Sequence, residues 1–283
     1  MRPRPFDFYQ PTSIKEASEI LHSHEDAKPL AGGQSLIPMM KLRIFSPSEI
    51  MSLAKIKEMK PYISETGQIL KIGAMATHDM IHRSDVLRNA VPVLSEAAGE
   101  IADQQIRNRG TIGGNIAHGD PSTNLSAALL ALDAEIEVQG IEGTRIIPID
   151  EFFLDLFTTA LDHGEIITEF RVKASPHTKQ KFMKVAKSDT AFPMAFVALN
   201  VGLSEGFVEN ARIALGVAGP TPLRALEAEK FLLKKRLDSE VITKAAQIAT
   251  KDLEPPSDVH ASEEYRKQLL STLIKRGLSS FVG

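Results

Sequence analysis

Along the first 175 residues, apolar and polar positions alternate in short runs that switch between the spacing of strands and that of helices. Apolar runs bounded by turn residues predict strands at 28–30, 48–53, 68–72, 134–139, 144–149 and 164–172. Helical spacing predicts helices at 14–23, 36–44, 78–83, 92–105, 122–132 and 151–156. Strands and helices that interleave in this way are typical of a mixed α and β fold.

Capping side chains support several of these helix starts. Ser13, with Glu16 three residues later, forms a capping box for the first helix. Ser35, Thr77 and Ser122 offer hydroxyl groups at three further helix starts.

The pattern changes after 174–177, where Ala-Ser-Pro-His interrupts it. Three strands are predicted in succession at 181–186, 195–203 and 211–217, and three helices follow at 225–233, 239–252 and 261–276. The turn at 204–206 joins two of the strands, and 253–259 is a predicted loop. We therefore expect a first domain at 1–175 and a second, α+β domain at 176–283, with helices on one face of a three-stranded antiparallel sheet.

Composition narrows the function classes. The chain of 283 residues is 43% hydrophobic and 24% charged with a formal net charge of −3, which disfavours nucleic acid as a partner. No run of 18 apolar residues predicts a membrane span, and the basic N-terminus lacks the apolar core of a secretory signal, so we expect a cytoplasmic protein. The chain has no cysteine, so disulfides, thiolate-held clusters and a cysteine nucleophile are excluded.

The candidate chemistry lies in two double-glycine loops, at 31–35 (Ala-Gly-Gly-Gln-Ser) and 111–115 (Thr-Ile-Gly-Gly-Asn). Glycine lets backbone amides approach an anion closely, because no Cβ blocks the contact. Neither loop has the Lys-Ser or Lys-Thr of a nucleotide-hydrolysing phosphate loop, and neither has the three-glycine dinucleotide fingerprint. A lone double glycine is commonly a tight turn, but Ser35, Thr111 and Asn115 add polar groups that suit a pyrophosphate.

Other polar residues give weaker signals. His78 and His82 are four apart but lack the further ligands of a metal site, so the structural interpretation is preferred and no metal is predicted. His118 follows the second loop and is a candidate site-lining residue. Arg107 and Arg109 either finish the preceding helix, which Gly110 stops, or support the second loop from outside. No Gly-x-Ser-x-Gly elbow is present, and we predict no catalytic residue.

With these motifs in this order, the chain resembles the FAD-binding medium subunit of the molybdenum hydroxylases, the group of carbon monoxide dehydrogenase, xanthine dehydrogenase and the aldehyde and N-heterocycle oxidoreductases. The resemblance covers essentially the whole chain and is carried by the segments 5–9, 11–12, 30–38, 72–74, 109–115, 118–121, 165–167 and 182–184. It implies a two-part FAD-binding fold of the vanillyl-alcohol-oxidase (PCMH) type, with subdomains at about 1–55 and 56–175, followed by a C-terminal flavoprotein domain at 176–283.

The resemblance also implies the residues that contact FAD. Ile101 matches an apolar position beside the flavin, and Ile167 and Lys184 match a backbone contact and a polar contact. Asn124 stands where many relatives have Asp, and Asp120 is the nearest acid. The implied set is Leu30, Ala31, Gly32, Gly33, Gln34, Ser35, Leu36, Ile101, Thr111, Gly113, Gly114, Asn115, His118, Asp120, Asn124, Ile167, Lys184 and Phe192, where some relatives place an aromatic side chain beside the flavin ring.

The function implied by the resemblance is electron transfer. A large molybdenum-cofactor subunit would oxidise the substrate, a small two-iron two-sulfur subunit would pass electrons to FAD on this chain, and FAD would reduce an external acceptor. The implied assembly is a dimer of heterotrimers. The lack of cysteine argues against the 4-hydroxybenzoyl-CoA reductase branch, which carries an extra cluster on this subunit. A stand-alone FAD oxidoreductase and a non-catalytic scaffold are the alternatives, while substrate and acceptor stay open.

Overall fold

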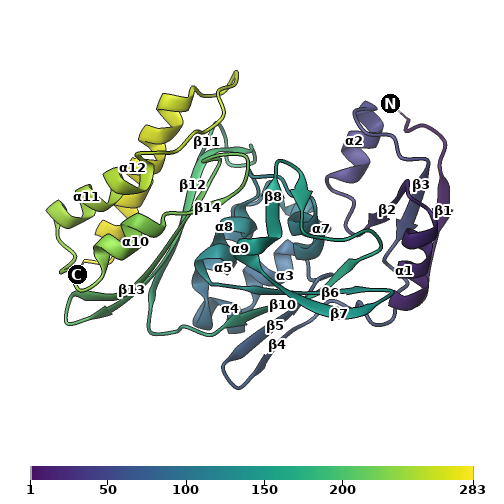
Figure 1. Cartoon of the computed structure of the whole chain (residues 1–283), viewed down its shortest axis with the longest axis horizontal. Coiled ribbons are helices and arrows are strands. Elements are labelled where there is room, and N and C mark those ends of the chain that lie inside the picture. Colours follow the sequence, from purple (N-terminus) through teal and green to yellow (C-terminus); the bar gives the residue numbers. More distant parts are fainter. Residues whose placement is uncertain (1, 283) are drawn as a thin grey trace.

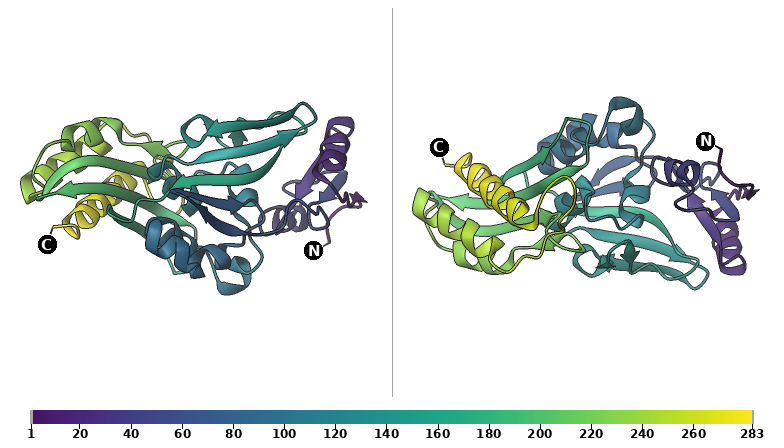
Figure 2. Two further views of the ribbon diagram at one scale, coloured as in Figure 1. Left: turned by 90° about the horizontal axis from the view of Figure 1, so that it is seen from below. Right: turned by 90° about the horizontal axis from the view of Figure 1, so that it is seen from above.

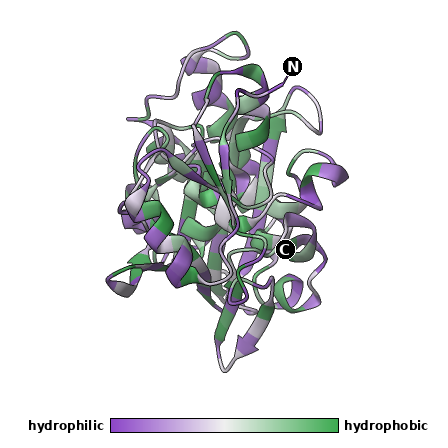
Figure 3. Ribbon diagram, turned by 90° about the vertical axis from the view of Figure 1, so that its right-hand side faces the viewer, coloured by the Kyte–Doolittle hydropathy of each residue, from purple (hydrophilic) through white to green (hydrophobic). Residues whose placement is uncertain are grey.

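The computed structural model describes residues 2–282 and arranges them as three successive units along the long axis (Figures 1 and 2). The N-terminal unit forms one end, the strands and helices of the middle of the chain form the centre, and the C-terminal sheet and helices form the other end. Seen along the long axis, hydrophobic segments lie mostly toward the middle of the molecule, and many outer helices and loops are hydrophilic (Figure 3). None of the helices in this described part is long and apolar enough to cross a membrane.

The N-terminal unit is a parallel three-stranded sheet in the order β1-β3-β2 with two helices. Its elements are β1 (Asp7–Tyr9), α1 (Ile14–Ser23), β2 (Ala27–Leu30), α2 (Leu36–Leu42) and β3 (Glu49–Ser52). The predicted start of α1 is confirmed, because the Ser13 hydroxyl accepts from the N–H of Glu16. The Glu16 carboxylate in turn accepts from the N–H of Thr12, at 2.8 Å. This reciprocal pair satisfies two backbone donors.

The central unit contains an antiparallel five-stranded sheet in the order β4-β5-β10-β6-β7. Its strands are β4 (Ile63–Thr66), β5 (Ile69–Gly73), β6 (Glu135–Gly140), β7 (Gly143–Pro148) and β10 (Ile166–Lys173). Its helices are α3 (His78–Arg83), α4 (Asp85–Ala90), α5 (Pro92–Gly99), α6 (Gln104–Arg107), α7 (Ile112–Ala117), α8 (Asn124–Ala131) and α9 (Ile149–Phe152). Thr77 caps α3 as predicted, by accepting from the N–H of Met80.

The prediction of a single helix at 92–105 is wrong, because residues 100–103 interrupt it and two helices, α5 and α6, form instead. Ala102 adopts a left-handed conformation with φ of 39°. The Asp103 carboxylate then caps α6 by accepting from the N–H of Ile106. A continuous helix would use the carbonyl groups of residues 100–102 internally. Here the side chains of Lys184 and Arg107 take them instead.

Three other helix predictions need correction. The helix that Ser122 was predicted to cap, through Leu132, begins at Asn124 with Thr123 at its N-cap position. Ser122 makes no capping bond, and its N–H and hydroxyl both donate to Asp120. The predicted helix 36–44 ends at Leu42, since Arg43 is left-handed, and the Ser35 side chain makes no capping bond. The helix predicted at 151–156 is the short α9, followed by a hairpin of β8 (Phe153–Asp155) and β9 (Thr158–Thr159).

The C-terminal unit is an antiparallel sheet of four strands where three were predicted. It contains β11 (Lys179–Ala186), β12 (Pro193–Ser204), β13 (Phe207–Gly216), the short β14 (Leu223–Arg224), α10 (Leu226–Leu232), α11 (Ser239–Thr250) and α12 (Glu263–Ser279). Helices α10 and α12 pack on this sheet, and α5 and α8 of the central unit also pack against its strands. All eight residues of α8 are buried, as expected for a helix that is apolar on all sides.

Candidate cofactor-binding site

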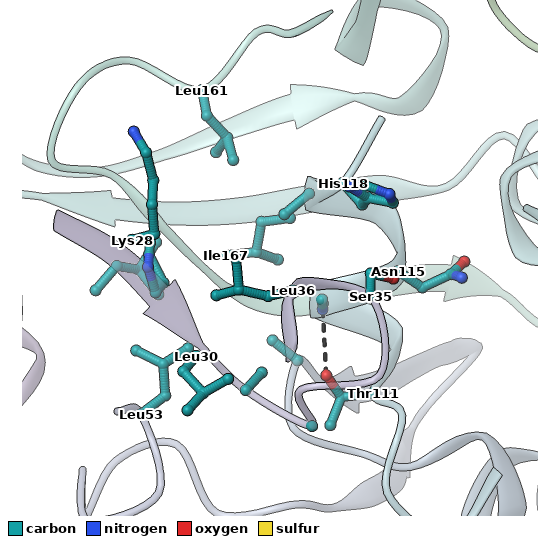
Figure 4. A pocket seen from close by; sticks show the side chains of 18 of the residues that line it. Lys28, Leu30, Ser35, Leu36, Leu53, Thr111, Asn115, His118, Leu161 and Ile167 are labelled. Atoms are coloured by element: carbon teal, nitrogen blue, oxygen red, sulfur yellow. Dashed lines mark hydrogen bonds between the residues drawn. The ribbon is translucent and has the colours of Figure 1, made fainter. Parts of the chain in front are cut away.

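A cavity of about 680 Å³ lies between the N-terminal and central units, within the range of small-molecule sites of roughly 300–1,000 Å³ (Figure 4). We call it the interdomain cavity. One wall comes from β2, the first glycine loop and α2, and the other comes from α7, the 161–165 loop and the start of β10. Both glycine loops therefore face the same cavity, although about 80 residues separate them in the sequence.

The first glycine loop presents unpaired backbone donors. Within the described part of the chain, the N–H groups of residues 32–35 donate to no protein acceptor. The Gln34 side chain donates to the carbonyl oxygen of Gly32, at 3.1 Å, and this bond folds the loop. Gly33 has a φ of +75°, which an L side chain rarely adopts. Because unpaired N–H groups are costly when desolvated, this row is suited to an anionic ligand such as a pyrophosphate.

The second glycine loop works differently from the first. The N–H of Gly113 donates to the carbonyl of Ala74 at 2.9 Å. The N–H of Gly114 donates to the Thr111 hydroxyl at 3.2 Å, drawn dashed in Figure 4. The expectation that both loops offer free amides therefore fails for the second, since one N–H is used by the cap of α7 and the other attaches α7 to Ala74. Its unpaired polar atom is instead the buried Oδ1 of Asn115.

The two loops also touch each other. A Cβ on Gly32 would lie 2.0 Å from the carbonyl oxygen of Arg109, far inside van der Waals contact. A Cβ on Gly114 would lie 3.6 Å from that of Ala31, which is an ordinary contact. Gly32 is therefore required where the two units meet, in addition to its place in the cavity wall.

His78 is a buried histidine that lines this cavity. Its side chain is 3% exposed, and its Nδ1 has no partner within residues 2–282. Burial, and to a smaller extent the charge of Arg107, lower the pKa of His78 to about 4. Its backbone N–H donates to the carbonyl of Gly110 at 3.0 Å, directly before the second loop. The sequence analysis interpreted His78 as a structural residue and did not predict that it lines the cofactor cavity.

Lys28 is a second cavity residue that the sequence analysis missed. It lies on β2 with Leu30, and both line the cavity (Figure 4). Residues two apart on a strand share a face, so the predicted role of Leu30 was the signal that could have identified Lys28. Its ammonium group adds positive charge to the wall that carries the free amides.

Thirteen of the eighteen expected cofactor residues line the interdomain cavity. They are Leu30, Ala31, Gly32, Gly33, Gln34, Ser35, Leu36, Thr111, Gly113, Gly114, Asn115, His118 and Ile167. The other five do not line it. They are Ile101, Asp120, Asn124, Lys184 and Phe192.

Two of these five lie together at the break between α5 and α6. The Lys184 ammonium group donates to the carbonyl of Glu100, next to the half-buried Ile101. Burial lowers the pKa of Lys184.

The remaining three expected residues also lie outside the cavity wall, and each has different surroundings. Asp120 accepts from the Ser122 hydroxyl at 2.5 Å. Asn124 is buried and donates to the carbonyl of Ala97 at 3.2 Å. Phe192 is 76% exposed. Their contacts with a cofactor stay predictions.

The cavity fits an elongated ligand with a pyrophosphate. Free amides and Lys28 suit the anionic part, Asn115 offers a buried acceptor, and Leu36 and Ile167 provide apolar wall. No group of three or more acidic or histidine residues within 2–282 is placed to bind a metal ion. These features match FAD, which combines a pyrophosphate with large ring systems.

Comparison with known proteins decides the family. Residues 4–174 match the model of the FAD binding domain in molybdopterin dehydrogenase, and residues 180–281 match that of the CO dehydrogenase flavoprotein C-terminal domain. The chain belongs to the FAD-binding medium subunits of the molybdenum hydroxylases. The resemblance, the FAD-binding fold and FAD as the cofactor are thereby confirmed.

Members of this family align with nearly the full chain. The carbon monoxide dehydrogenase medium chain of Hydrogenophaga pseudoflava is 36% identical and aligns over 99% of this chain and 95% of its own length. The glyceraldehyde dehydrogenase medium chain of Sulfolobus acidocaldarius is 33% identical, with 96% and 97% covered. A solved structure of carbon monoxide dehydrogenase from Hydrogenophaga pseudoflava superposes with a TM-score of 0.96 at 38% identity, over 99% of this chain and 98% of that one.

The close approach at Gly32 predicts that Gly32→Ala separates the two units. Its new Cβ cannot be accommodated against the Arg109 carbonyl without a backbone shift, so we expect a loss of about 1–3 kcal/mol in unfolding free energy and weaker FAD binding. Urea unfolding and fluorescence titration with FAD measure the two effects. Gly219→Ala is the control, because its Cβ would meet its nearest neighbour at 3.5 Å. Equal behaviour of the two variants would contradict this account.

The buried His78 predicts a pH dependence of stability. Its pKa falls from 6.5 in the unfolded chain to about 4 on folding, so stability present above pH 6.5 is lost as pH falls toward 4. From pH 7 to pH 5 this loss is about 2 kcal/mol. The unfolding free energy of the apoprotein is measured in urea at pH 7 and at pH 5. The decrease between the two pH values should be about 2 kcal/mol smaller in His78→Gln than in the wild type. The exposed His260→Gln serves as control, and an unchanged pH dependence in His78→Gln would refute the prediction.

Proposed function

We propose that this chain is the FAD-binding electron-transfer subunit of a molybdenum-containing hydroxylase or dehydrogenase complex. It would take electrons from a two-iron two-sulfur subunit and pass them to an external acceptor. The observation that carries the proposal is the row of free amides at residues 32–35, in a loop that lines a cavity between two units in a chain of this family. The proposed partners are a large molybdenum-cofactor subunit and the small iron–sulfur subunit, in a dimer of heterotrimers.

We assign the residues around the interdomain cavity to binding and orientation. The amides of residues 32–35 would hold the pyrophosphate, and Lys28 would add charge complementarity. Asn115 would accept a hydrogen bond from a ligand hydroxyl, and apolar residues such as Leu36 and Ile167 would exclude water. When bound, FAD supplies the capacity to accept electrons singly and to release them as a pair.

The other five expected contacts form the second part of this proposal. Ile101 and Lys184 lie near the same interruption between α5 and α6, where Lys184 bonds to the carbonyl of Glu100, and their contact with the flavin is proposed from the family resemblance. Asp120, Asn124 and Phe192 are proposed from the family resemblance. The proposed domains are 1–175, with subdomains at about 1–55 and 56–175, and 176–283, which follow the grouping of strands into separate sheets.

Oxidation of the substrate is assigned to another chain. Two relatives of nearly full-length similarity are named for different substrates, glyceraldehyde and carbon monoxide. Both names describe the relative as the medium chain of a dehydrogenase, that is, as one subunit among several. This pattern supports the electron-transfer subunit over the stand-alone oxidoreductase.

The proposal predicts one FAD per chain and no substrate reaction by the chain alone. The full chain is purified, its visible spectrum is recorded, and the released cofactor is identified by mass. Dithionite should bleach the bound flavin, whereas candidate aldehydes and purines should bleach it only after the partner subunits are added. Dithionite thus controls for a flavin that cannot be reduced.

Two other outcomes would contradict the proposal. Bleaching of the chain alone by one of these substrates would favour the stand-alone oxidoreductase. A chain that takes up no FAD, even with its partners present, would refute the role in electron transfer.

A further inference from the structure

The break between α5 and α6 is held by two cationic side chains. The Lys184 ammonium group, from β11, donates to the carbonyl of Glu100. The Arg107 guanidinium donates to the carbonyls of Ile101 and Ala102, each at 2.9 Å. Ala102 has a positive φ, a backbone conformation that persists only where surrounding contacts impose it. Three successive carbonyl groups are thus held against the local preference of the chain.

Arg107 is unusual because it pairs with backbone rather than with an acid. Within residues 2–282 it forms no ion pair with a carboxylate. Its remaining hydrogen bond goes to Oε1 of Gln104 at 3.2 Å, and its Nε is buried without a partner. A half-buried arginine with this set of bonds is placed to fix backbone, because the two N–H groups of its Nη1 bridge two carbonyl groups while Nη2 bonds to Gln104.

A short rigid path links Arg107 to the contact between the two glycine loops. Arg107 ends α6, and the N–H of Gly110 donates back to the carbonyl of Ile106 at 2.7 Å. The carbonyl oxygen of Arg109, between them, is the atom that Gly32 approaches. A shift of α6 would therefore move Arg109 and Gly110 away from the first glycine loop.

We propose that Arg107 is a positioning residue for the FAD site, which closes the interdomain cavity from outside without contacting the cofactor. By holding the carbonyls of Ile101 and Ala102, it fixes α6 and keeps Arg109 against Gly32. Lys184, which belongs to the C-terminal unit, bonds to the neighbouring carbonyl of Glu100. The C-terminal unit therefore also contacts the segment that Arg107 fixes. This inference rests on the proposed function, because it concerns the affinity of the same cofactor site.

Replacement of Arg107 should weaken FAD binding more than it weakens the fold. Charged hydrogen bonds to two carbonyls are lost in Arg107→Met, and we expect FAD to bind about ten- to a hundredfold more weakly. Fluorescence titration of the full-length apoprotein with FAD measures the affinity, and urea unfolding measures stability separately. Arg88→Met is the matched control, because Arg88 is an exposed arginine paired with Asp85 on α4.

A double-variant cycle tests the route through Gly32. In a Gly32→Ala background the two loops are already separated, so adding Arg107→Met should change FAD affinity by less than threefold. An effect of Arg107 on FAD affinity that does not pass through the Gly32 contact would give the same fold-loss in both backgrounds. That result would overturn the proposal.

The outcomes separate this inference from the proposed function. Failure of the wild-type chain to bind FAD refutes both, whereas wild-type binding with equal affinity in Arg107→Met overturns this inference alone. If Arg107→Met does not fold, Arg107→Lys decides, because it keeps the charge without the planar fork. Weaker FAD binding by Arg107→Lys, at unchanged urea midpoint, supports the proposal, and wild-type affinity overturns it.

Discussion

The close backbone approach between Gly32 and the carbonyl of Arg109 is the contact on which the cofactor site depends. It brings two loops that are distant in the sequence to the same cavity, and it leaves no room for a Cβ. The first loop lines the cavity there, and its N–H groups at residues 32–35 donate to no acceptor within residues 2–282. The site is therefore a property of the contact between two units, and neither unit forms it alone.

The two glycine loops differ in whether their backbone N–H groups are free: the first loop is suited to binding a ligand, and the second supports the structure. The first loop keeps its backbone donors free and has Lys28 beside it, which is the arrangement that favours an anion. The second loop uses its donors to build α7 and to attach it to Ala74. Behind it, His78 is kept neutral by burial and Arg107 binds backbone carbonyls. The two acids that line the cavity, Asp162 and Glu165, are paired with Arg145, which leaves Lys28 available to an anionic ligand.

Local rules predicted the parts of the fold that local interactions decide. Ser13 and Thr77 cap their helices as predicted, since a capping bond spans only three residues. The break at residues 100–103 was missed, because its cause lies partly in Lys184, about 80 residues further along the chain. For the site, the glycine motifs identified two loops that line the cavity from opposite sides, whereas His78 was missed because only tertiary packing brings it there. Ser122 does not cap the following helix, whose N-cap position is Thr123, and it bonds to Asp120 instead.

The central claim is that FAD lies between the two glycine loops and is held by the amides of the first. A crystal structure of the full chain with bound FAD tests it most directly. The account predicts pyrophosphate oxygens within hydrogen-bonding distance of the N–H groups of residues 32–35, with Gly32 still against the Arg109 carbonyl. FAD bound outside the interdomain cavity, or a pyrophosphate with no contact to these amides, would contradict the account.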